Sequence, residues 1–400
     1  MHDNKFGMFI HWGIYAVTEI QEQVLARENL DNKEYEKLMH RFNPVKYDPA
    51  EWVALAKNAG MKYICITTKH HDGFCMWDTK YTDYNIMNTP YGKDVIKMLA
   101  EECHKQGMLL SFYYSCPDWH HEHGFNACST HQWKSVNKEE ANQEIYREYV
   151  KNQITELMTN YGPIYTLFWD IPPRYEDKSM NELVRKLQPG IFINNRGWDK
   201  GDFSTPEREM DKVAGDQKFT SMVEMCESVG EQSWGYRARE DYQSVRYLTY
   251  SINKMMARGG SYLLNIGPKA DGTISDEAKD ILEKVGNWYN HMEGSLESPV
   301  TDEYDYKIKR YNCIVNKKDN KSYFNFIEGI SSSAVNLGNF PHEPKKVRLM
   351  NTGADLRYSI EILHDYFDIA TGACDGEYLH IYNIPTDELL DQPIVIEIEW

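Results

Sequence analysis

Short apolar segments alternate with helical patterns along the first three quarters of the chain. The apolar runs are mostly uninterrupted, as expected of parallel strands covered on both faces, and they read FGMFIHWG, YICITT, LLSFYYS, YTLFWD, IFINNR, FTSMVEM and SYLLNIG. Apolar stripes at helical spacing lie between them, over residues 48–60, 94–105, 138–160, 247–258 and 275–289. This repeated order predicts an α/β fold of the (β/α)8-like TIM barrel type, because each crossover lays its helix on the outside of the sheet.

Beyond Ser298 the pattern changes to alternating apolar and polar positions. Val347 and Leu349 are two residues apart, and isoleucines at 394, 396 and 398 keep the same period of two. Turn-forming pieces separate these runs, so we expect an antiparallel β-sandwich of about 100 residues. The predicted domains are a catalytic barrel over 1–297 and a C-terminal sandwich over 298–400. The 400-residue length fits a barrel of roughly 250 to 300 residues with a small module.

Charge, cysteine spacing and hydropathy exclude several classes of protein. The chain carries 61 acidic and 44 basic residues, a formal charge of −17, without a block of Lys and Arg, which argues against nucleic acid as a partner. The eight cysteines show no spacing typical of zinc sites, so we expect no metal. No run is long enough to span a membrane and no export signal is visible, so we expect a cytoplasmic protein without a membrane partner; export stays open because a leader could have been trimmed.

Two carboxylates end predicted strands and suit acid–base chemistry. Asp170 ends the apolar run YTLFWD, and Glu224 ends FTSMVEM, 54 residues later. In a barrel the reacting groups stand at the carboxyl ends of the strands, and two such carboxylates are what glycoside cleavage requires. Other interpretations remain open: Asp170 as a helix N-cap, Glu224 paired with an arginine such as Arg196, and Glu207 or the less favoured Glu227 as the acid/base.

Histidine and aromatic side chains at the other strand ends suit the binding of a small polyol. His11, His70 and His71 offer imidazole nitrogens to hydroxyl groups, and Trp12, Trp77 and Tyr114 offer flat apolar faces. Further histidines occur in a long segment over 115–133 that fits no element, at positions 120, 121, 123 and 131. We expect these to be solvent-exposed loop residues and not metal ligands, because no carboxylate or cysteine lies at ligand spacing.

Together these motifs resemble the α-L-fucosidases of glycoside hydrolase family 29. The resemblance rests on KFGMFIHWGIYAV, AKNAGMKYICITTKHHDGFCMWDTKYTDYN, LLSFYYS, LFWD, INNRGW, TPE, EMC with SWGY ten residues on, and GGSYLLNIGPKADGTI. It implies a retaining exo-acting enzyme that removes terminal α-L-fucose from glycans or glycoconjugates through a covalent fucosyl-enzyme, without a cofactor. The tail PKKVRLMNTG to VIEIEW is similar to the C-terminal β-sandwich of that family.

The resemblance also implies roles for individual residues. Asp170 is the expected nucleophile and Glu224 the expected acid/base, with Glu207 as the alternative. The expected substrate-binding residues are His11, Trp12, His70, His71, Trp77, Tyr114, Trp169, Arg196 and Trp234.

The chain departs from the usual family pattern beside both expected catalytic residues. Val223 stands where a tryptophan normally precedes the glutamate, and Ile171 stands where a glycine often follows the nucleophile. Two alternative functions therefore stay open: another retaining glycosidase on the same barrel, such as one acting on α-galactosides, and a catalytically silent fucose-binding protein.

Overall fold

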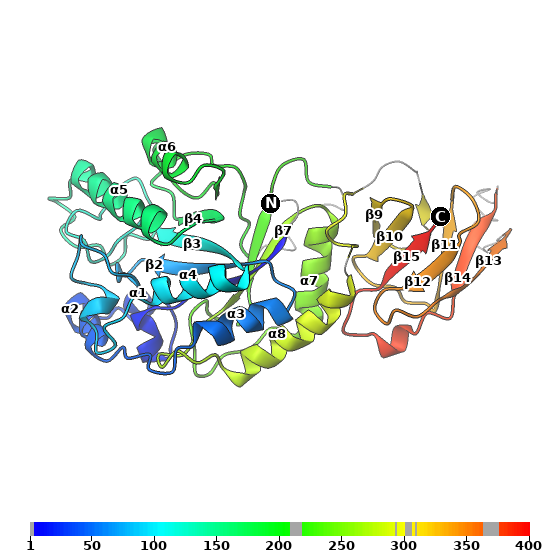
Figure 1. Ribbon diagram of the computed structural model, residues 1–400, viewed down its shortest axis with the longest axis horizontal. Helices are drawn as coiled ribbons and strands as arrows, with labels where there is room; N and C mark the ends of the chain where they lie inside the picture. Colours follow the sequence, from blue (N-terminus) through cyan, green and yellow to red (C-terminus); the bar gives the residue numbers. More distant parts are fainter. Residues whose placement is uncertain (1–3, 209–217, 293, 301–305, 309, 363–375) are drawn as a thin grey trace.

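The first part of the chain forms a curled sheet of seven parallel strands with helices on its outside (Figure 1). The computed structural model describes residues 4–208, 218–292, 294–300, 306–308, 310–362 and 376–400. The strand order is β5-β4-β3-β2-β1-β7-β6. The strands are β1 (Phe6–Ile10), β2 (Tyr63–Lys69), β3 (Leu109–Ser115), β4 (Thr166–Asp170), β5 (Phe192–Ile193), β6 (Glu224–Ser228) and β7 (Ser261–Ile266).

An irregular segment over 203–207 links the two edge strands, β5 and β6. Parallel bridges join Phe203 to the residue after β5, Ser204 to Val223, and Glu207 to Cys226 within β6. Pro206 has no N–H group to donate, so the segment cannot form a regular ladder even though its carbonyl accepts from Cys226 N at 3.1 Å. The segment occupies the place of an eighth strand, and the predicted barrel-like fold is confirmed.

The helices are α1 (Val24–Arg27), α2 (Asn32–Glu36), α3 (Pro49–Asn58), α4 (Val95–Gln106), α5 (Gln143–Asn160), α6 (Lys178–Leu187), α7 (Val245–Ala257) and α8 (Asp276–Tyr289). Single 3-10 turns are η1 (Ile14–Thr18), η2 (Lys37–His40), η3 (Ile86–Asn88), η4 (Asn290–Met292) and η5 (Thr386–Glu388). The five predicted helices are confirmed as α3, α4, α5, α7 and α8. The sequence reading missed α6 and began α5 too early, because Asn142 caps that helix by accepting from Glu144 N at 2.9 Å.

The C-terminal part is a sandwich of two four-stranded antiparallel sheets, as predicted. Their strand orders are β12-β15-β10-β9 and β13-β14-β11-β8. The strands are β8 (Lys307–Ile308), β9 (Cys313–Lys318), β10 (Lys321–Phe326), β11 (Ala334–Gly338), β12 (Lys346–Leu349), β13 (Arg357–Glu361), β14 (Tyr378–Tyr382) and β15 (Val395–Glu399). Ile396 and Ile398 of β15 point into the sandwich core, while Val395 on the opposite face joins the core of the barrel.

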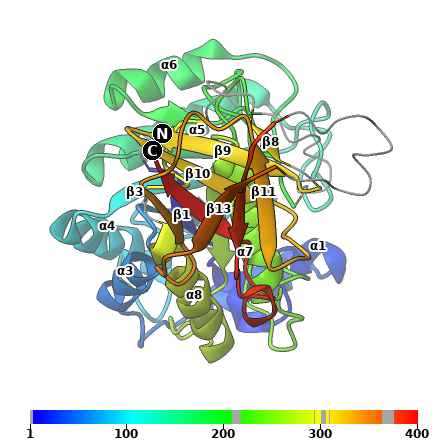
Figure 2. The ribbon, with the colours of Figure 1, turned by 90° about the vertical axis from the view of Figure 1, so that its right-hand side faces the viewer.

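The sandwich packs against the end of the barrel where the strands begin. Asn316 of β9 donates a hydrogen bond to the carbonyl of Ala257, the last residue of α7, at 2.9 Å. Figure 2 looks at the sandwich with the barrel behind it. The opposite end of the barrel, where the strands finish, is left open for a site. Among the described residues, no helix combines the length and the apolar character that a membrane crossing needs.

Candidate active site

A cavity of about 110 Å³ lies at the carboxyl ends of the barrel strands. It is called the central cavity below. Its lining residues are Phe9, His11, Gln23, His70, His71, Tyr113, His131, Phe168, Asp170, Ile171, Arg196, Glu207, Cys226 and Trp234. The strands contribute alternate residues to it, such as Phe168 and Asp170 from β4, because successive side chains of a strand point to opposite faces.

Asp170 lies in the central cavity as a buried, ionised carboxylate. The Tyr113 hydroxyl donates to its Oδ2 at 2.7 Å, Arg196 Nη1 donates to its Oδ1 at 3.1 Å, and His71 Nε2 lies 3.8 Å away. Burial alone would raise the pKa of this carboxyl group. The positive charge of Arg196, with smaller contributions from His71 and Tyr113, outweighs burial and holds the pKa of Asp170 below its ordinary value of 3.8.

Arg196 brings a second carboxylate, Glu207, next to Asp170. The same Nη1 atom that contacts Asp170 donates to Glu207 Oε2 at 2.8 Å. The guanidinium group is fixed from behind, because its Nε and Nη2 both donate to the carbonyl of Thr205, at 3.2 and 2.8 Å. Contacts of 3.1 and 2.8 Å to one nitrogen leave the two carboxylate oxygens at most 5.9 Å apart, the sum of both distances. This separation suits direct attack on a sugar carbon by one of the two groups, since inverting pairs stand about 6.5–9.5 Å apart.

Glu224 does not reach the central cavity. The prediction that it ends a strand is wrong, because β6 begins at Glu224 and runs to Ser228. Glu224 is four residues from Ser228 at the end of this strand, which corresponds to about 13 Å at roughly 3.3 Å per residue. Glu224 therefore lies at the opposite end of the barrel, where its carboxylate accepts a hydrogen bond from Tyr63, the first residue of β2. It does not pair with Arg196, and its expected place beside Asp170 is corrected.

The environment of Glu224 favours the protonated form of its carboxyl group. Burial raises the pKa of Glu224 to about 7, and the hydrogen bond from Tyr63 lowers it only in part. Its Oε1 is buried and has no hydrogen-bond partner in the described part of the chain. Glu227 also lies outside the central cavity and accepts from the Tyr247 hydroxyl at 3.0 Å. Both glutamates are residues of β6 in the barrel wall and do not contribute to the lining of the central cavity.

The histidines of the central cavity are held as neutral imidazoles. His11 Nδ1 donates to the Asn265 side-chain oxygen at 2.7 Å, and His71 Nδ1 donates to Ser115 Oγ at 2.6 Å. Burial lowers the pKa of each of these two histidines to about 4. Burial also lowers the pKa of His70, whose buried Nδ1 has no hydrogen-bond partner among the residues that the structure describes. Neutral rings with one free nitrogen can donate to or accept from sugar hydroxyls.

Four predicted binding residues do not line the central cavity. Trp12, Trp77, Tyr114 and Trp169 are fully buried between the sheet and its surroundings. The polar atom of each is satisfied there, by Lys269 O, Glu156 Oε2, Gln153 Oε1 and Asn181 Oδ1 respectively. They pack within the barrel. Tyr114 of β3 and Trp169 of β4 each stand next to an inward-facing residue and therefore point outward, whereas Trp12 and Trp77 lie beyond the ends of β1 and β2.

Other predicted binding residues do line the central cavity: His11, His70, His71, Arg196 and Trp234. Buried Glu22 fixes the backbone at the last of these by accepting from Trp234 N at 2.9 Å and Gly235 N at 3.0 Å. The sequence reading missed Phe9, Gln23, Tyr113, Phe168 and Cys226 as lining residues, although strand alternation places four of them on the inward face. It also expected His131 to be exposed, whereas this loop residue enters the central cavity.

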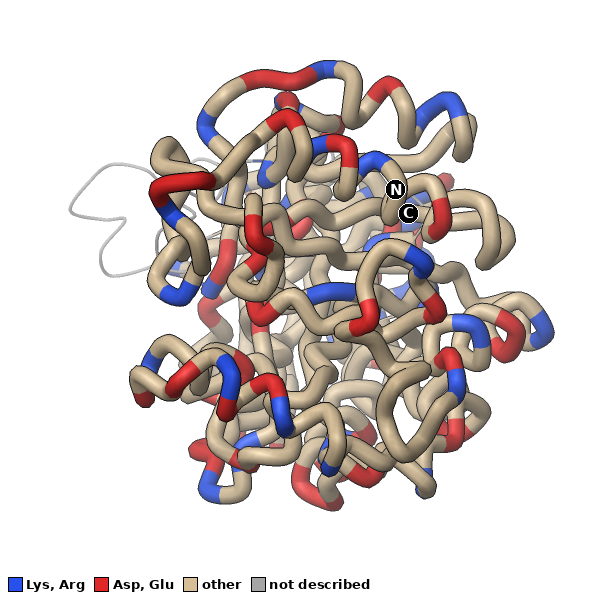
Figure 3. The backbone as a smooth tube through the Cα atoms, turned by 90° about the vertical axis from the view of Figure 1, so that its left-hand side faces the viewer, with Lys and Arg blue, Asp and Glu red and all other residues tan. Residues whose placement is uncertain are grey.

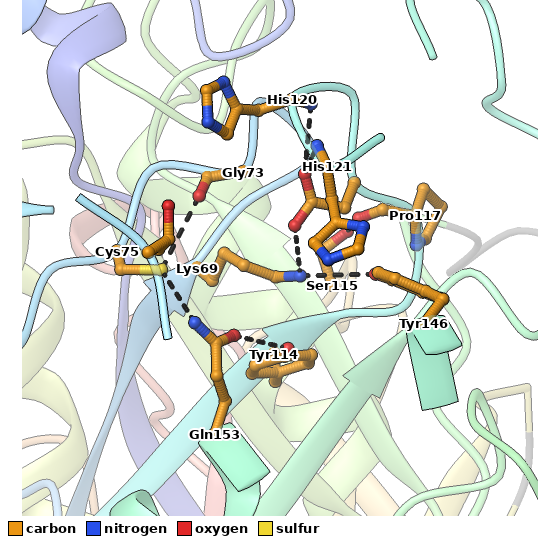
Figure 4. A network of polar contacts seen from close by, with 12 residues as sticks. Lys69, Gly73, Cys75, Tyr114, Ser115, Pro117, His120, His121, Tyr146 and Gln153 are labelled. Carbon is orange, nitrogen blue, oxygen red and sulfur yellow. Dashed lines mark hydrogen bonds and ion pairs between the residues drawn. The ribbon is translucent and has the colours of Figure 1, made fainter. Parts of the chain in front are cut away.

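A buried ion pair ties the end of β2 to the loop that carries His131 (Figure 4). Lys69 Nζ lies 2.8 Å from Asp118 Oδ2, and the side chains are 0% and 1% exposed. Asp118 Oδ1 also accepts from the backbone N–H groups of His120 and His121, at 3.0 and 2.8 Å. Burial opposes the charged carboxylate, but Lys69 and these neighbours lower the pKa of Asp118 to about 2. The pair therefore sets the path of the loop over 115–133.

No group of three or more His, Cys, Asp or Glu side chains in the described part of the chain is arranged to hold a metal ion. The seven described cysteines are free thiols, and Cys374 lies outside the described residues. The absence of a metal stays a prediction.

Comparison with known proteins identifies the family. The family model described as alpha-L-fucosidase matches residues 1–293. The solved structure of alpha-L-fucosidase isoenzyme 1 from Paenibacillus thiaminolyticus is 31% identical, covers 100% of this chain and 97% of its own, and superposes with a TM-score of 0.82. Human tissue alpha-L-fucosidase is 24% identical over 89% of this chain and 81% of its own length.

A more distant structure agrees in fold. An alpha-L-fucosidase from Bacteroides thetaiotaomicron, solved as a trapped covalent intermediate with 2-fluoro-fucosyl fluoride, is 24% identical, covers 100% of this chain and 94% of its own, and gives a TM-score of 0.78. The family match spans the whole barrel, including every residue of the central cavity. The chain therefore belongs to the α-L-fucosidase family of glycoside hydrolases.

Proposed function

We propose that this enzyme removes terminal α-L-fucose from glycans or glycoconjugates with retention of configuration, using Asp170 as nucleophile and Glu207 as acid/base. The observation that carries the proposal is the shared contact of both carboxylates with Arg196 Nη1. It keeps one oxygen of each carboxylate at most 5.9 Å apart, below the roughly 6.5–9.5 Å that separates inverting pairs. A covalent intermediate has been trapped in the similar Bacteroides enzyme, which agrees with this mechanism.

The first step forms a fucosyl-enzyme. A carboxylate oxygen of Asp170 attacks C1 while the bond from C1 to the glycosidic oxygen breaks, and Glu207 gives its proton to that oxygen. Asp170 suits attack because its depressed pKa keeps it ionised. Tyr113 and Arg196 hold the carboxylate in position and satisfy its charge before the bond forms.

The second step releases fucose. Glu207, now ionised, takes a proton from a water molecule whose oxygen attacks C1, and the bond to Asp170 breaks. Arg196 stays close to both carboxylates in each step, so it stabilises whichever one carries the charge. The step restores both groups to their starting protonation states.

The other lining residues suit a deoxy sugar. The neutral rings of His11, His70 and His71 offer nitrogens to hydroxyl groups on one side. Phe9 and Phe168 lie with ring centroids 5.2 Å apart in the same cavity, and they offer an apolar surface to the C6 methyl group. A hydroxymethyl sugar would leave its hydroxyl group unpaired there, which disfavours an α-galactosidase. The small cavity at the barrel end suits a terminal residue of the substrate.

The test determines which anomer of fucose wild-type enzyme releases first from an aryl α-L-fucoside, and it measures kcat of the Asp170→Ala variant with the same substrate. Proton NMR of the wild-type reaction should show α-L-fucose as the first product. The variant should lose at least about a thousandfold in kcat, equivalent to about 4 kcal/mol of barrier. Formation of the β-anomer first, or a variant within about tenfold of wild type (about 1.4 kcal/mol), would refute the proposal.

A further inference from the structure

A second groove opens beside the central cavity. This side groove has a volume of about 530 Å³, and it shares Gln23, His131, Glu207 and Trp234 with the central cavity. Its other lining residues are Ile20, Gln21, Glu22, Arg27, Glu28, Arg208, Gln232 and Arg237. The glycosidic oxygen departs on the side of the acid/base, and Glu207 forms the wall between the two spaces. If the proposed function holds, the side groove receives the sugar that follows fucose.

Arg208 is a fixed positive charge in the wall of the side groove. Its guanidinium group donates to the carbonyls of Glu231, Gly230 and Ser233, the last two at 3.0 and 3.1 Å. It lies over the Trp234 ring, 4.7 Å from its centroid. The carbonyl oxygens hold the guanidinium group in place without carrying a charge of their own, and its Nε forms an ion pair with Glu227 Oε1 at 3.7 Å.

Arg27 and Arg237 add two positive charges to the side groove. Within the described residues, neither guanidinium group has an ion pair or a side-chain hydrogen bond. The acids of the groove are mostly engaged elsewhere: Glu22 accepts from two backbone N–H groups, and Glu207 pairs with Arg196. The exposed Glu28 is left as the one lining carboxylate not committed in this way.

The side of the molecule that Figure 3 faces shows no broad cluster of basic residues among those the structure describes. In Figure 3, which views the side of the molecule where α1 and α2 lie in Figure 1, acidic and basic residues are interspersed. The chain as a whole carries a formal charge of −17. The three arginines of the side groove are therefore a local feature, and they act on a ligand by contact and not by long-range attraction.

We infer that the side groove binds an anionic aglycone sugar, one that carries a sulfate ester or a carboxylate. A guanidinium group presents paired N–H donors that match both of these anions. The side-chain amides of Gln21 and Gln232 supply donors and acceptors for the neutral hydroxyls of the same sugar. This inference rests on the proposed function and names the class of substrate for it.

The experiment compares three disaccharides and one aryl fucoside. The disaccharides are α-L-fucosyl-N-acetylglucosamine, its 6-sulfate, and an α-L-fucosyl uronic acid; the two charged substrates separate sulfate from carboxylate recognition. Wild-type enzyme should prefer at least one charged substrate by about tenfold or more in kcat/KM, because hydrogen bonds to charged groups exceed neutral ones. The Arg27→Gln and Arg237→Gln double variant should lose this preference through KM. Its kcat/KM for the aryl fucoside should change far less than that for the charged substrates, because the aryl group carries no anion for the two arginines to bind.

Arg239→Gln is the matched control. It removes the same charge from an exposed position that does not line the side groove, so it should keep the preference. A wild-type enzyme that cleaves the aryl fucoside but shows no preference for either charged substrate would overturn the inference while leaving the proposed function standing. A preference that survives in the double variant, or that falls equally in Arg239→Gln, would overturn it as well. Failure to cleave any fucoside would remove the proposed function and the inference together.

Discussion

Replacing Glu224 by glutamine should stabilise the protein above pH 7 and have a much smaller effect at pH 5. The carboxyl group is 1% exposed and has the Tyr63 hydroxyl as its hydrogen-bond partner. Folding raises its pKa from 4.5 to about 7. Between these two values the folded state binds the proton more tightly than the unfolded state, so stability is full below about pH 4.5 and falls as the pH rises to 7. Glutamine imitates the protonated acid and removes this dependence.

The size of the effect follows from the two pKa values. Each pH unit of difference corresponds to about 1.4 kcal/mol, so the ionised glutamate costs about 3 kcal/mol above pH 7. A chain of this length has an unfolding entropy near 0.8 kcal/mol per kelvin, at about 2.1 cal/mol/K per residue. If the chain unfolds as one unit, Glu224→Gln should raise Tm at pH 8 by roughly 3 to 4 °C.

Calorimetric scans of wild type and Glu224→Gln at pH 5, 6, 7 and 8 make the test. Tyr63→Phe is the matched control: it removes the hydrogen bond that favours the ionised form, so its Tm should fall more steeply with pH than that of wild type. The Glu224→Gln enzyme should also keep its activity on an aryl fucoside within about tenfold. Parallel Tm–pH curves for wild type and Glu224→Gln would refute the placement of a buried, neutral glutamic acid at this end of the barrel.

Three further predictions concern the cavity and its support. Glu207→Ala should slow substrates with poor leaving groups more than activated aryl fucosides, and azide should restore activity; equal losses without rescue would move the acid/base role elsewhere. Lys69→Met should cost about 3–5 kcal/mol of stability in chemical denaturation, because it leaves Asp118 charged and buried, and adding Asp118→Asn should recover part of this loss. Because Arg196 lowers the pKa of Asp170, kcat/KM should hold down to about pH 4, and in Arg196→Met the acidic limb of the pH–rate profile should move to higher pH.

The pattern of the sequence was sufficient for the barrel, the sandwich and the position of Asp170 at the end of a strand in the central cavity. Apolar runs bounded by capped helices placed most strands, and Asp170 stands at the end of β4 because YTLFWD is an uninterrupted buried run. The alternation of side chains along each strand also predicts which residues face the cavity, and the sequence analysis did not apply it. Since Asp170 faces the cavity, Trp169 must face outward and Phe168 inward, and the same rule separates Tyr113 from Tyr114.

Two features of the site depend on contacts that a sequence pattern does not reveal. Glu224 follows an apolar run but begins its strand, because the backbone before it pairs with the irregular segment through the bond from Glu224 N to Ser204 O at 2.9 Å. His131 reaches the cavity from a loop whose first part is held by the Lys69–Asp118 pair and its hydrogen bonds. Neither long-range contact has a local signature in the chain.

Trapping the covalent intermediate tests the central claim most directly. Glu207→Gln enzyme, in which release of the sugar is slowed, is incubated with 2-fluoro-fucosyl fluoride, digested and mapped by mass spectrometry. The account predicts one fluorofucosyl group per chain, attached to the peptide that contains Asp170. Attachment to another carboxylate, or rapid fluoride release with no labelled peptide in any digest, would contradict it.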